Sequence, residues 1–497
     1  MGSHLLKLHP SDNVAVTTAR VPEGAEVLID GHALSVQEDV PAGHKIALTD
    51  LHTGASVVKY GHPIGTVTRP VKRGCWLHTH TMQTNLEGVL AYRYEPAEPS
   101  LQVTDGAGTF DGYRRANGAV GTRNEVWVVN TVGCVNRSAD RITRICREQF
   151  SEGIDGIHTF AHPYGCSQSG DDLESTRRIL AGMISHPNAG GVLLLGLGCE
   201  DNQIDGLMQV AGDVDRSRIR HFNSQDVSDD VEHGVALVGE LVGLMQHDRR
   251  TAHSTRDLIV GLKCGGSDSF SGVTANPLVG RIADRITAQA GGAILTEVPE
   301  MFGAEQTLMN RAVNERVFRD IERLVNDFKQ YYVAHGRPIY ENPSPGNLEG
   351  GLTTLEEKAL GATRKGGNAT VTEVLRYGER KRTPGLSLLE APGNDAVSTT
   401  ALVAAGATVI LFTTGRGTPL GSPVPTIKIS SNTALYERKP SWIDFNAGFL
   451  QDGSAKMEEL AADLFDLLID VASGRRQTKN EHNDYRDIAI WKTGVTL

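Results

Sequence analysis

Apolar segments rich in β-branched residues alternate with helical segments along most of the chain, and this alternation limits the possible folds most strongly. Residues 125–132 and 191–198 are mainly apolar, which is typical of strands buried on both faces of a sheet. Between them, residues 171–185 have helical periodicity and an acidic start. Strands that alternate with helices predict a mostly parallel sheet covered on both faces, so the fold class is α/β.

The same alternation resumes after a charged segment, residues 245–257. Three further buried strands are expected there, in the sequences LIVGLK, GAILTE and ATVILFTT. Long helices are expected over residues 304–332 and 456–473, and the second of these is followed by Gly474 as a stop signal. The charged segment therefore marks a boundary between two α/β domains.

The N-terminal part has a different pattern. Up to about Leu90, short segments alternate apolar and polar residues between glycine, proline and aspartate, which predicts a small all-β domain. A chain of 497 residues is expected to form several domains of about 150 residues. The predicted organisation is a β domain over residues 5–94, a linker over 95–112, an α/β domain over 113–250 and a second α/β domain over 251–497.

Composition excludes several classes of partner. The formal net charge of −11 argues against nucleic-acid binding, which needs a basic surface. No apolar stretch reaches the roughly 18 residues that span a membrane, and no export signal is present. Six cysteines in so long a chain are too few for a disulfide scaffold, so we expect a cytoplasmic protein that acts on a small molecule.

Four of the cysteines share a context. Each lies at or just beyond the end of an apolar, strand-like segment and next to a glycine: Cys134, Cys166, Cys199 and Cys264. The carboxyl ends of parallel strands form the ligand crevice of an open α/β sheet, so the four thiols could converge there. A thiolate cluster would bind iron, zinc or an iron–sulfur cluster. The alternative is that each cysteine is a small buried apolar side chain, since no close pair spacing of a metal motif is present.

Histidines provide a second set of candidates. His78 and His80 are two residues apart, so on an extended strand both rings would lie on one face and could reach one metal or substrate. Two solvated surface histidines are the alternative. By the same parity His158 and His162 share a face, and His162, four residues before Cys166, is the better candidate of that pair.

Charged and hydroxyl side chains after other strands suggest a site for an acid. Ser267 and Asp268 follow one strand in a segment of small residues whose backbone amides could hold a carboxylate. Glu297 and Glu300 follow another strand and could bind metal or transfer protons, or simply cap a helix. Arg416, between two glycines after a third strand, could bind a substrate carboxylate through two hydrogen bonds.

Lys358 follows a long polar loop and is a further candidate. No phosphate-binding loop and no dinucleotide fingerprint is found in the sequence, which disfavours nucleotide and nicotinamide chemistry.

Eleven segments in chain order resemble the altronate dehydratase family of sugar-acid dehydratases, which also includes galactarate dehydratase. The resemblance covers nearly the whole chain from Leu5. The segments are DNVAV, GHKIALTD, YGHPIG, YRRANGAVGTRNEVW, YGCSQSGDD, GLGCE, CGGSDSFSGVTANP, TEVPEMFGAEQ, YENPSPGN, GERKRTPGL and FTTGRGTP.

The resemblance implies a β-clip (SAF) domain at the N-terminus, a second domain that mediates a homodimer, and a Rossmann-like C-terminal domain. It implies dehydration of an aldonic or aldaric acid with the help of ferrous iron. Within the family, altronate dehydratases carry a histidine pair at the position of His78 and His80, and galactarate dehydratases lack it. The expected reaction is therefore conversion of D-altronate to 2-keto-3-deoxy-D-gluconate, with galactarate as the alternative substrate.

Such a reaction removes the proton on carbon 2 and the hydroxyl on carbon 3, and it needs a cation to stabilise the doubly charged intermediate. His162, His80 and Lys358 are candidate bases, His78 a candidate acid and Arg416 a carboxylate ligand. The metal ligands stay open between the cysteines and a set of histidines with Glu297 or Glu300. Manganese and an iron–sulfur cluster are alternatives to a single ferrous ion, and a sugar-acid-binding scaffold without turnover is the non-enzymatic alternative.

Overall fold

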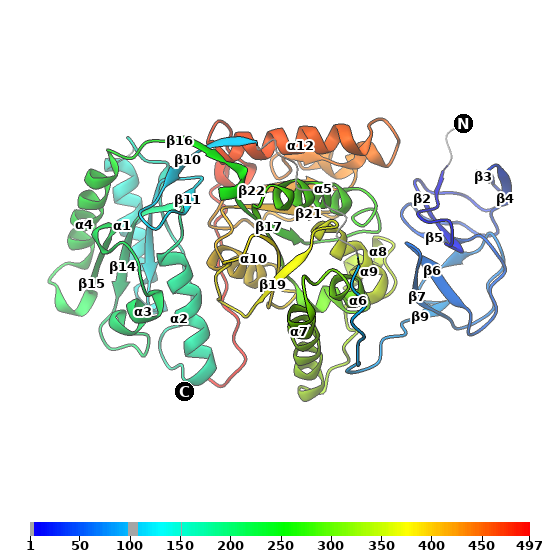
Figure 1. Cartoon of the computed structure of the whole chain (residues 1–497), viewed down its shortest axis with the longest axis horizontal. Coiled ribbons are helices and arrows are strands. Elements are labelled where there is room, and N and C mark those ends of the chain that lie inside the picture. The colour runs from blue at the N-terminus through cyan, green and yellow to red at the C-terminus, as the bar shows by residue number, and fades with distance from the viewer. Residues whose placement is uncertain (1–3, 98–107, 151) are drawn as a thin grey trace.

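The structure is a computed structural model that describes residues 4–97, 108–150 and 152–497. Three bodies follow one another along the long axis of the molecule (Figure 1): the N-terminal β domain, the C-terminal α/β domain in the middle, and the second α/β domain at the far end. The predicted multidomain α/β class with a small β domain at the N-terminus is confirmed.

The N-terminal domain consists of short antiparallel strands arranged in small sheets, β1-β2-β5-β8 and β6-β7-β9, with a β3-β4 hairpin. Burial follows the expected period of two in β3 and β6, where Val27 and Val57 are buried next to exposed residues, whereas β2 and β5 are buried along their whole length. The strands are β1 (Leu5–Leu6), β2 (Val14–Thr17), β3 (Glu26–Ile29), β4 (His32–Ser35), β5 (Lys45–Ala47), β6 (Ser56–Lys59), β7 (His62–Val67), β8 (Trp76–Leu77) and β9 (Met82–Gln83).

The second domain is built on a four-stranded parallel sheet of order β13-β12-β14-β15. Helices α1 and α4 share one hydrophobic core with this sheet, and α2 and α3 contribute to a core on its other face. The elements are β10 (Thr109–Arg114), β11 (Val120–Gly121), β12 (Glu125–Asn130), α1 (Asn136–Gln149), β13 (Gly156–Thr159), α2 (Gly170–Ile184), β14 (Ala189–Gly196), α3 (Ile204–Ala211), β15 (Ile219–Asn223), α4 (Asp230–Met245) and β16 (Thr251–Ser254).

The C-terminal domain has a seven-stranded, fully parallel sheet of order β19-β20-β18-β17-β21-β22-β23. Its strands are β17 (Ile259–Cys264), β18 (Gly292–Leu295), β19 (Val371–Leu375), β20 (Gly385–Leu389), β21 (Val409–Thr414), β22 (Thr426–Ser430) and β23 (Phe445–Asn446). Its helices are α5 (Ala275–Ala288), α6 (Glu305–Met309), α7 (Glu315–Ala334), α8 (Pro345–Glu349), α9 (Leu355–Ala362), α10 (Asp395–Ala404), α11 (Thr433–Arg438), α12 (Met457–Ala472) and α13 (Lys479–His482).

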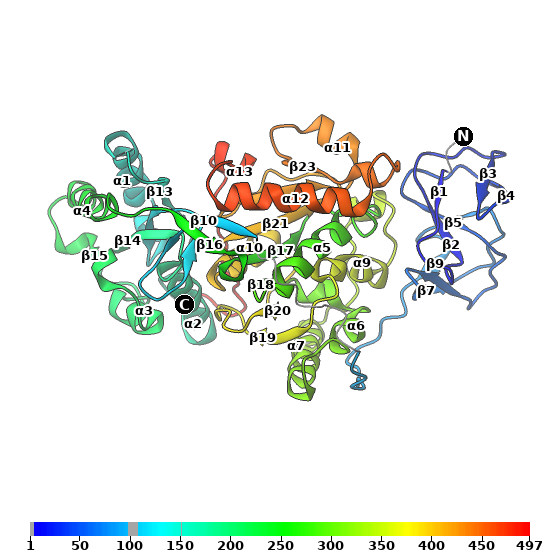
Figure 2. The ribbon, with the colours of Figure 1, turned by 45° about the horizontal axis from the view of Figure 1, so that its top comes forward.

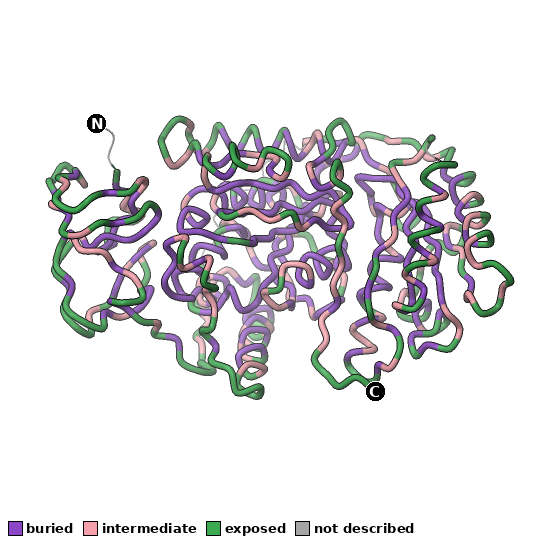
Figure 3. The backbone as a smooth tube through the Cα atoms, turned by 180° about the vertical axis from the view of Figure 1, so that it is seen from behind, coloured by how far each residue is buried: buried purple, intermediate pink, exposed green. Residues whose placement is uncertain are grey.

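Both faces of this sheet are covered, which explains its apolar strands. Along β21, Val409 and Leu411 point into the core shared with α5 and α12, and Ile410 and Phe412 point into the core shared with α10. Figure 2 shows α5 and α12 lying together over the sheet, and Figure 3 shows the sheet as a mainly buried layer.

The second domain packs directly on the C-terminal domain. Helix α2 contacts α10 so closely that a Cβ atom at Gly182 would lie 2.5 Å from the carbonyl oxygen of Ala404. The chain also returns to the second domain near its C-terminus, where the backbone amides of Thr493 and Gly494 donate to the Asp172 carboxylate. These contacts fix the two α/β domains against each other.

Two predicted elements differ in the structure. The helix expected over residues 304–332 is divided into α6 and α7, because Asn314 accepts a hydrogen bond from the amide of Val317 and starts a new helix there. The predicted linker falls largely on residues 98–107, outside the described part of the chain, and β10 already begins at Thr109 and pairs with β16. Among the described residues, no helix is long and apolar enough to cross a membrane.

Candidate functional site

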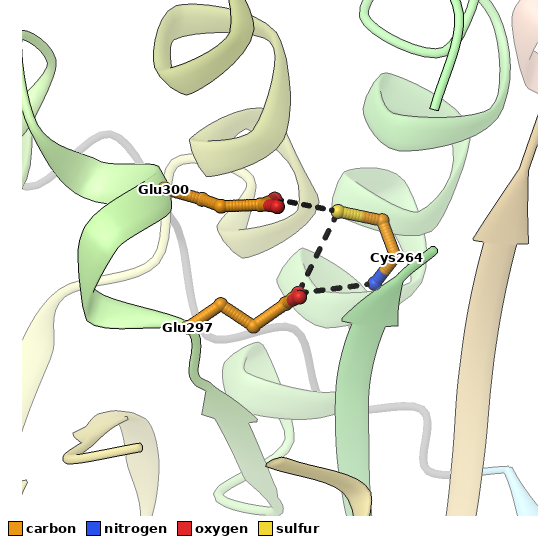
Figure 4. A group of neighbouring side chains, drawn as sticks. All are labelled: Cys264, Glu297 and Glu300. Atoms are coloured by element: carbon orange, nitrogen blue, oxygen red, sulfur yellow. Dashed lines mark hydrogen bonds between the residues drawn. The ribbon is translucent and has the colours of Figure 1, made fainter. Parts of the chain in front are cut away.

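A buried cluster of acidic, thiol and lysine side chains lies where β17 and β18 end. Lys263 and Cys264 end β17, and Glu297 and Glu300 lie on the turn directly after β18. The Cys264 thiol lies 3.1 Å from Glu300 Oε2 and 3.6 Å from Glu297 Oε2 (Figure 4). The strands that follow β17 in the chain, β18 to β20, lie on one side of it in the sheet. Strand β21, which comes next in the chain, lies on the other side of β17. Ligands bind at such switch points in parallel sheets.

Three lysines neutralise this cluster. Lys365 Nζ lies 2.7 Å from Cys264 Sγ, and Lys358 Nζ lies 2.7 Å from Glu300 Oε1. Lys263 binds Glu297 and lies 2.7 Å from Asp395 Oδ1 at the start of α10. The three ammonium groups match three carboxylates, so the cluster is charge-balanced although nearly all of it is buried.

The backbone that carries Glu297 is strained. Its φ of 71° lies in the left-handed region, which costs a non-glycine residue on the order of 1–3 kcal/mol. The strain is held by packing, since Glu297 and the following Val298 are buried. Residues held in this way cluster at functional sites, where the conformation directs a side chain.

The pKa values of the two glutamates are shifted in opposite directions. Burial and the neighbouring Glu300 carboxylate raise the pKa of Glu297 to about 7. Burial opposes ionisation of Glu300 as well, but the ammonium groups of Lys358 and Lys365 outweigh it and lower its pKa. Burial and the two carboxylates raise the pKa of the Cys264 thiol to about 12. Glu297 therefore binds a proton more readily than Glu300, whose charge the lysines stabilise.

The same three residues form a possible metal site. Cys264, Glu297 and Glu300 each offer one ligand atom, and these atoms lie within 4.8 Å of one another. A thiolate with two carboxylates suits a divalent transition metal. The donors also accept hydrogen bonds from the lysines, so an ion would share them with ammonium groups that already stabilise the negative charge. The donor types and spacing fit the metal that the family resemblance implies.

Polar residues around the cluster join it to the α8 loop. Lys358 Nζ donates to Asn347 Oδ1 at 3.2 Å, and Asn347 Nδ2 donates to the carbonyl oxygen of Ser267 at 2.8 Å. At the end of the same helix, Glu349 accepts from Arg416 at 2.8 Å. The guanidinium of Arg416 is half-exposed and can therefore exchange this partner for a ligand carboxylate.

Asp268 has a supporting position. Its carboxylate is buried and accepts hydrogen bonds from Ser271, Ser431 and Asn432. Because both oxygens are engaged, the side chain joins the loop after β17 to the loop after β22, and Asn432 donates in turn to the carbonyl oxygen of Gly415 in the loop after β21. Asp268 thereby positions the segment that carries Arg416.

Histidines of the N-terminal domain reach the same α8 helix. His78 Nε2 lies 3.1 Å from the Leu348 carbonyl oxygen, and His44 Nε2 lies 3.3 Å from that of Glu349. Trp76 donates to His44 at 3.1 Å and packs on the His80 ring at 4.9 Å. The expected strand at this pair is wrong, because β8 ends at Leu77 and the histidines lie in a turn closed by Thr81.

A buried ion-pair triad holds the N-terminal domain in place. Lys45 and Lys59 contact the two carboxylate oxygens of Glu357 at 2.8 and 2.7 Å, and all three side chains are buried. Lys45 also donates to the carbonyl of Gly351 and to Thr353. Glu357 precedes Lys358 on α9, so this contact places the histidines and the buried cluster on either side of one loop.

The remaining predicted residues lie elsewhere. The four cysteines do not meet at one site, because Cys264 ends a strand of the C-terminal sheet while Cys134, Cys166 and Cys199 follow strands of the second-domain sheet. His162 lies in the second domain with both ring nitrogens engaged, by the carbonyl of Asn130 and the amide of Tyr164. Neither the three cysteines nor His162 contributes to the buried cluster.

Sequence reasoning missed Lys263, Lys365 and Asp395. One signal was available for Lys263, because a charged residue at the end of an apolar strand needs a partner if it is buried. Lys365 and Asp395 have no comparable signal in the sequence. They reach the cluster from a turn after α9 and from the start of α10, and only the tertiary fold brings these together.

A second concave region lies between the two α/β domains. Its cavity of about 760 Å³ is lined by basic residues, among them Arg178, Arg316 and Arg380, and by the acidic residues Asp320 and Glu373. The cavity contains neither the thiol nor the strained glutamate of the buried cluster. This cavity is the alternative binding site for an anionic ligand.

Comparison with known proteins agrees with this architecture. Three family descriptions match in order: the altronate/galactarate dehydratase SAF domain over residues 3–85, the D-galactarate dehydratase/altronate hydrolase second domain over 112–246, and the D-galactarate/altronate dehydratase C-terminal domain over 255–496. The chain is 50% identical to altronate dehydratase of Escherichia coli (strain K12) and 48% identical to that of Bacillus subtilis (strain 168), over 99% of each chain. Identity to galactarate dehydratase (L-threo-forming) of Escherichia coli (strain K12) is 34%, over 95% of this chain and 93% of that one. The chain belongs to the D-galactarate/altronate dehydratase family.

Proposed function

We propose that the chain is a hydro-lyase that converts D-altronate to 2-keto-3-deoxy-D-gluconate by loss of water across carbons 2 and 3. The observation that carries the proposal is the buried cluster of Cys264, Glu297, Glu300 and three lysines, in a chain that matches altronate dehydratases over its whole length. Galactarate dehydratase is the alternative, supported by a lower identity over a similar length.

The chemistry needs positive charge. The proton on carbon 2 is weakly acidic because it lies beside a carboxylate, so its removal creates a second negative charge on the substrate. Preorganised cations in a dry site stabilise such a charge far better than water does. The ammonium groups of Lys263, Lys358 and Lys365 are buried beside one another and supply this environment.

Individual residues then take distinct roles. Burial disfavours the charged form of Lys358, but the Glu300 carboxylate outweighs it and raises its pKa, so its Nζ carries a proton that it can give to the hydroxide leaving carbon 3. The His80 ring is exposed and has no hydrogen-bond partner among the described residues, so its free nitrogen can accept the proton from carbon 2. Arg416 exchanges Glu349 for the substrate carboxylate.

Ferrous iron is the metal we propose, with Cys264, Glu297 and Glu300 as the residues that would hold it. When bound, the ion would act as a Lewis acid that adds to the positive charge of the lysines.

Metal removal tests this assignment. Chelation under reducing conditions is expected to lower kcat for altronate more than about a hundredfold, since a Lewis acid supplies several kcal/mol of charge stabilisation. Ferrous iron should restore the rate, and manganese, an alternative with similar ligand preferences, should restore it less. An unchanged rate in the stripped protein would show that the lysines suffice and that the metal is not needed.

Product analysis tests the reaction itself. The reduced, iron-loaded chain is incubated with altronate, galactarate, mannonate and gluconate, and 2-keto acids are quantified. We expect the highest kcat/KM with altronate. A higher value with galactarate would favour the alternative substrate, and binding of all four acids without any product would favour a non-enzymatic scaffold.

His80→Gln is expected to lower kcat for altronate by about 10²- to 10⁴-fold, the usual contribution of a general base. The fold should persist, because the ring packs on Trp76 at the surface. Steady-state kinetics measure the effect, and His52→Gln, which changes another exposed histidine of the same domain, is the matched control. A fall of less than tenfold would exclude His80 as the base.

A further inference from the structure

Three exposed cysteines stand apart from the buried cluster, on the second domain. Cys134, Cys166 and Cys199 lie in the loops after β12, β13 and β14, and all three are exposed. These strands are direct neighbours in the order β13-β12-β14 and run parallel. Neighbouring strands are about 4.8 Å apart, so the three loops emerge side by side at one edge of the sheet.

Direct backbone hydrogen bonds join the loops next to the cysteines. The amide of Gly133 donates to the carbonyl of Tyr164 at 2.8 Å, and the amide of Asn202 donates to the carbonyl of Gly165 at 3.0 Å. The Asn202 side chain also donates to the carbonyl of Thr131 at 2.9 Å. The three cysteines are therefore carried on one continuous, fixed surface.

A glycine precedes each cysteine, and the structure requires each of them. A Cβ atom at Gly133 would lie 2.8 Å from the carbonyl oxygen of His162, and one at Gly165 would lie 2.1 Å from that of Thr131. Gly165 and Gly198 also have φ values of 103° and 126°, which favour glycine. The sequence Gly-Cys thus recurs because the loops approach closely where each thiol emerges.

Three helix N-termini face the same edge. Helices α1, α2 and α3 are 14, 15 and 8 residues long and begin at Asn136, Gly170 and Ile204, shortly after the three cysteines. The positive end of a helix dipole lowers the energy of a nearby thiolate or anionic ligand. The edge also lies at a topological switch point, because β13 and β15 flank β12 and β14 on opposite sides.

We propose that the thiolates of Cys134, Cys166 and Cys199 hold a four-iron, four-sulfide cluster at this edge. Three protein thiolates leave one iron open to solvent or to a non-protein ligand. A preformed cluster of two ferrous and two ferric ions with four sulfides exchanges three small-molecule thiolate ligands for the three protein thiolates. Each protein thiol gives its proton to the thiolate that leaves, and no electron is transferred in this step. This inference is independent of the proposed dehydration, since it concerns another domain.

A cluster fits better than a single ion. Thiolates around one tetrahedral ion at about 2.3 Å lie only about 3.8 Å from one another. Within the described chain, the group that brings three ligand atoms within 4.8 Å of one another is Cys264 with the two glutamates, not these three sulfurs. Two buried acceptors next to this edge, Asn130 Oδ1 and Asn202 Oδ1, also lack partners among the described residues, as expected beside a bound group with its ordered water.

Iron and sulfide counts on the full chain test the proposal. After anaerobic incubation with a preformed four-iron, four-sulfide cluster that carries small-molecule thiolate ligands, we expect about four acid-labile sulfides per chain and a broad visible absorption band. The variant Cys134→Ser/Cys166→Ser/Cys199→Ser should lose the sulfide and the band and keep its far-ultraviolet circular dichroism. The control variants Cys75→Ser and Cys264→Ser should keep the sulfide and the absorption band.

Sulfide is the decisive readout, because an ion at Cys264 would add iron without sulfide. Iron without sulfide in the parent chain would overturn the cluster and leave the dehydration mechanism intact. Sulfide that persists in the triple variant, or zinc bound in place of iron, would overturn it as well. A parent chain with four sulfides but no turnover of sugar acids would support the cluster and contradict the proposed function.

Discussion

Replacing Lys358 with methionine is expected to lower kcat for altronate by about 10²- to 10⁴-fold, the range of a lost general acid. Methionine keeps the length and apolar stem of lysine but cannot donate a proton. The ammonium of Lys358 lies 2.7 Å from Glu300 and is held toward the site by Asn342 and Asn347. Because these contacts serve the leaving group rather than substrate binding, KM should change much less than kcat.

Controls separate catalysis from folding. Removing Lys358 leaves Glu300 with one cation fewer, so thermal melts of the variant must be compared with those of the parent. Lys358→Arg keeps the charge and should restore stability but only part of the rate, since a planar guanidinium donates with a different geometry. Lys72→Met, at an exposed lysine, should leave kcat unchanged. A fully active Lys358→Met variant would remove this residue from the mechanism.

Glu357→Gln is expected to lower the free energy of unfolding by about 3–5 kcal/mol, because it leaves the ammonium groups of Lys45 and Lys59 buried without a counter-ion. Denaturant unfolding followed by circular dichroism measures the loss. Turnover should fall too, since the triad holds the histidines against the α8 loop. Asp50→Asn, which breaks an exposed pair with Lys72, should leave the unfolding transition in place.

The loss of unfolding free energy in Glu357→Gln should depend on pH. Burial is the main cause that lowers the pKa of Lys45, to about 8 in the parent, and the Glu357 carboxylate opposes it. Without Glu357 the folded state favours the neutral amine still more, so the unfolded state binds more protons above neutrality and stability rises with pH. The deficit of Glu357→Gln should therefore shrink between pH 7 and pH 9. A deficit that stays constant over this range would contradict the buried-charge explanation.

Local patterns predicted the layers of the fold and part of the site. The apolar segment around residues 259–264 and the next strand were evident, and adjacent parallel strands place Cys264 beside the glutamates after β18 because Leu262 pairs with Leu295. The positions of the lysines at the site cannot be predicted from the sequence, for a physical reason. Lys358 and Lys365 come from α9 and the following turn, and their approach to Cys264 depends on packing between distant segments.

The histidine and cysteine motifs show what spacing alone can and cannot reveal. The spacing of His78 and His80 predicts a shared strand face, but a turn carries them instead: His78 contacts the Leu348 carbonyl of α8, and His80 packs on Trp76. The cysteines were grouped because each follows a strand, but the sequence does not state which strands share a sheet. Three cysteines follow strands of the second-domain sheet and Cys264 ends a strand of the C-terminal sheet, and only the strand order of the two sheets reveals this.

We propose that the sugar acid loses water between the α8 loop and the buried cluster of Cys264, Glu297 and Glu300. A crystal structure of Lys358→Met with D-altronate tests it most directly, since this variant should bind the acid without consuming it. We expect the substrate carboxylate on Arg416, with carbons 2 and 3 between His80 and the cluster. Altronate bound instead in the open cavity lined by Arg178 and Arg380, with no ligand at the cluster, would contradict it.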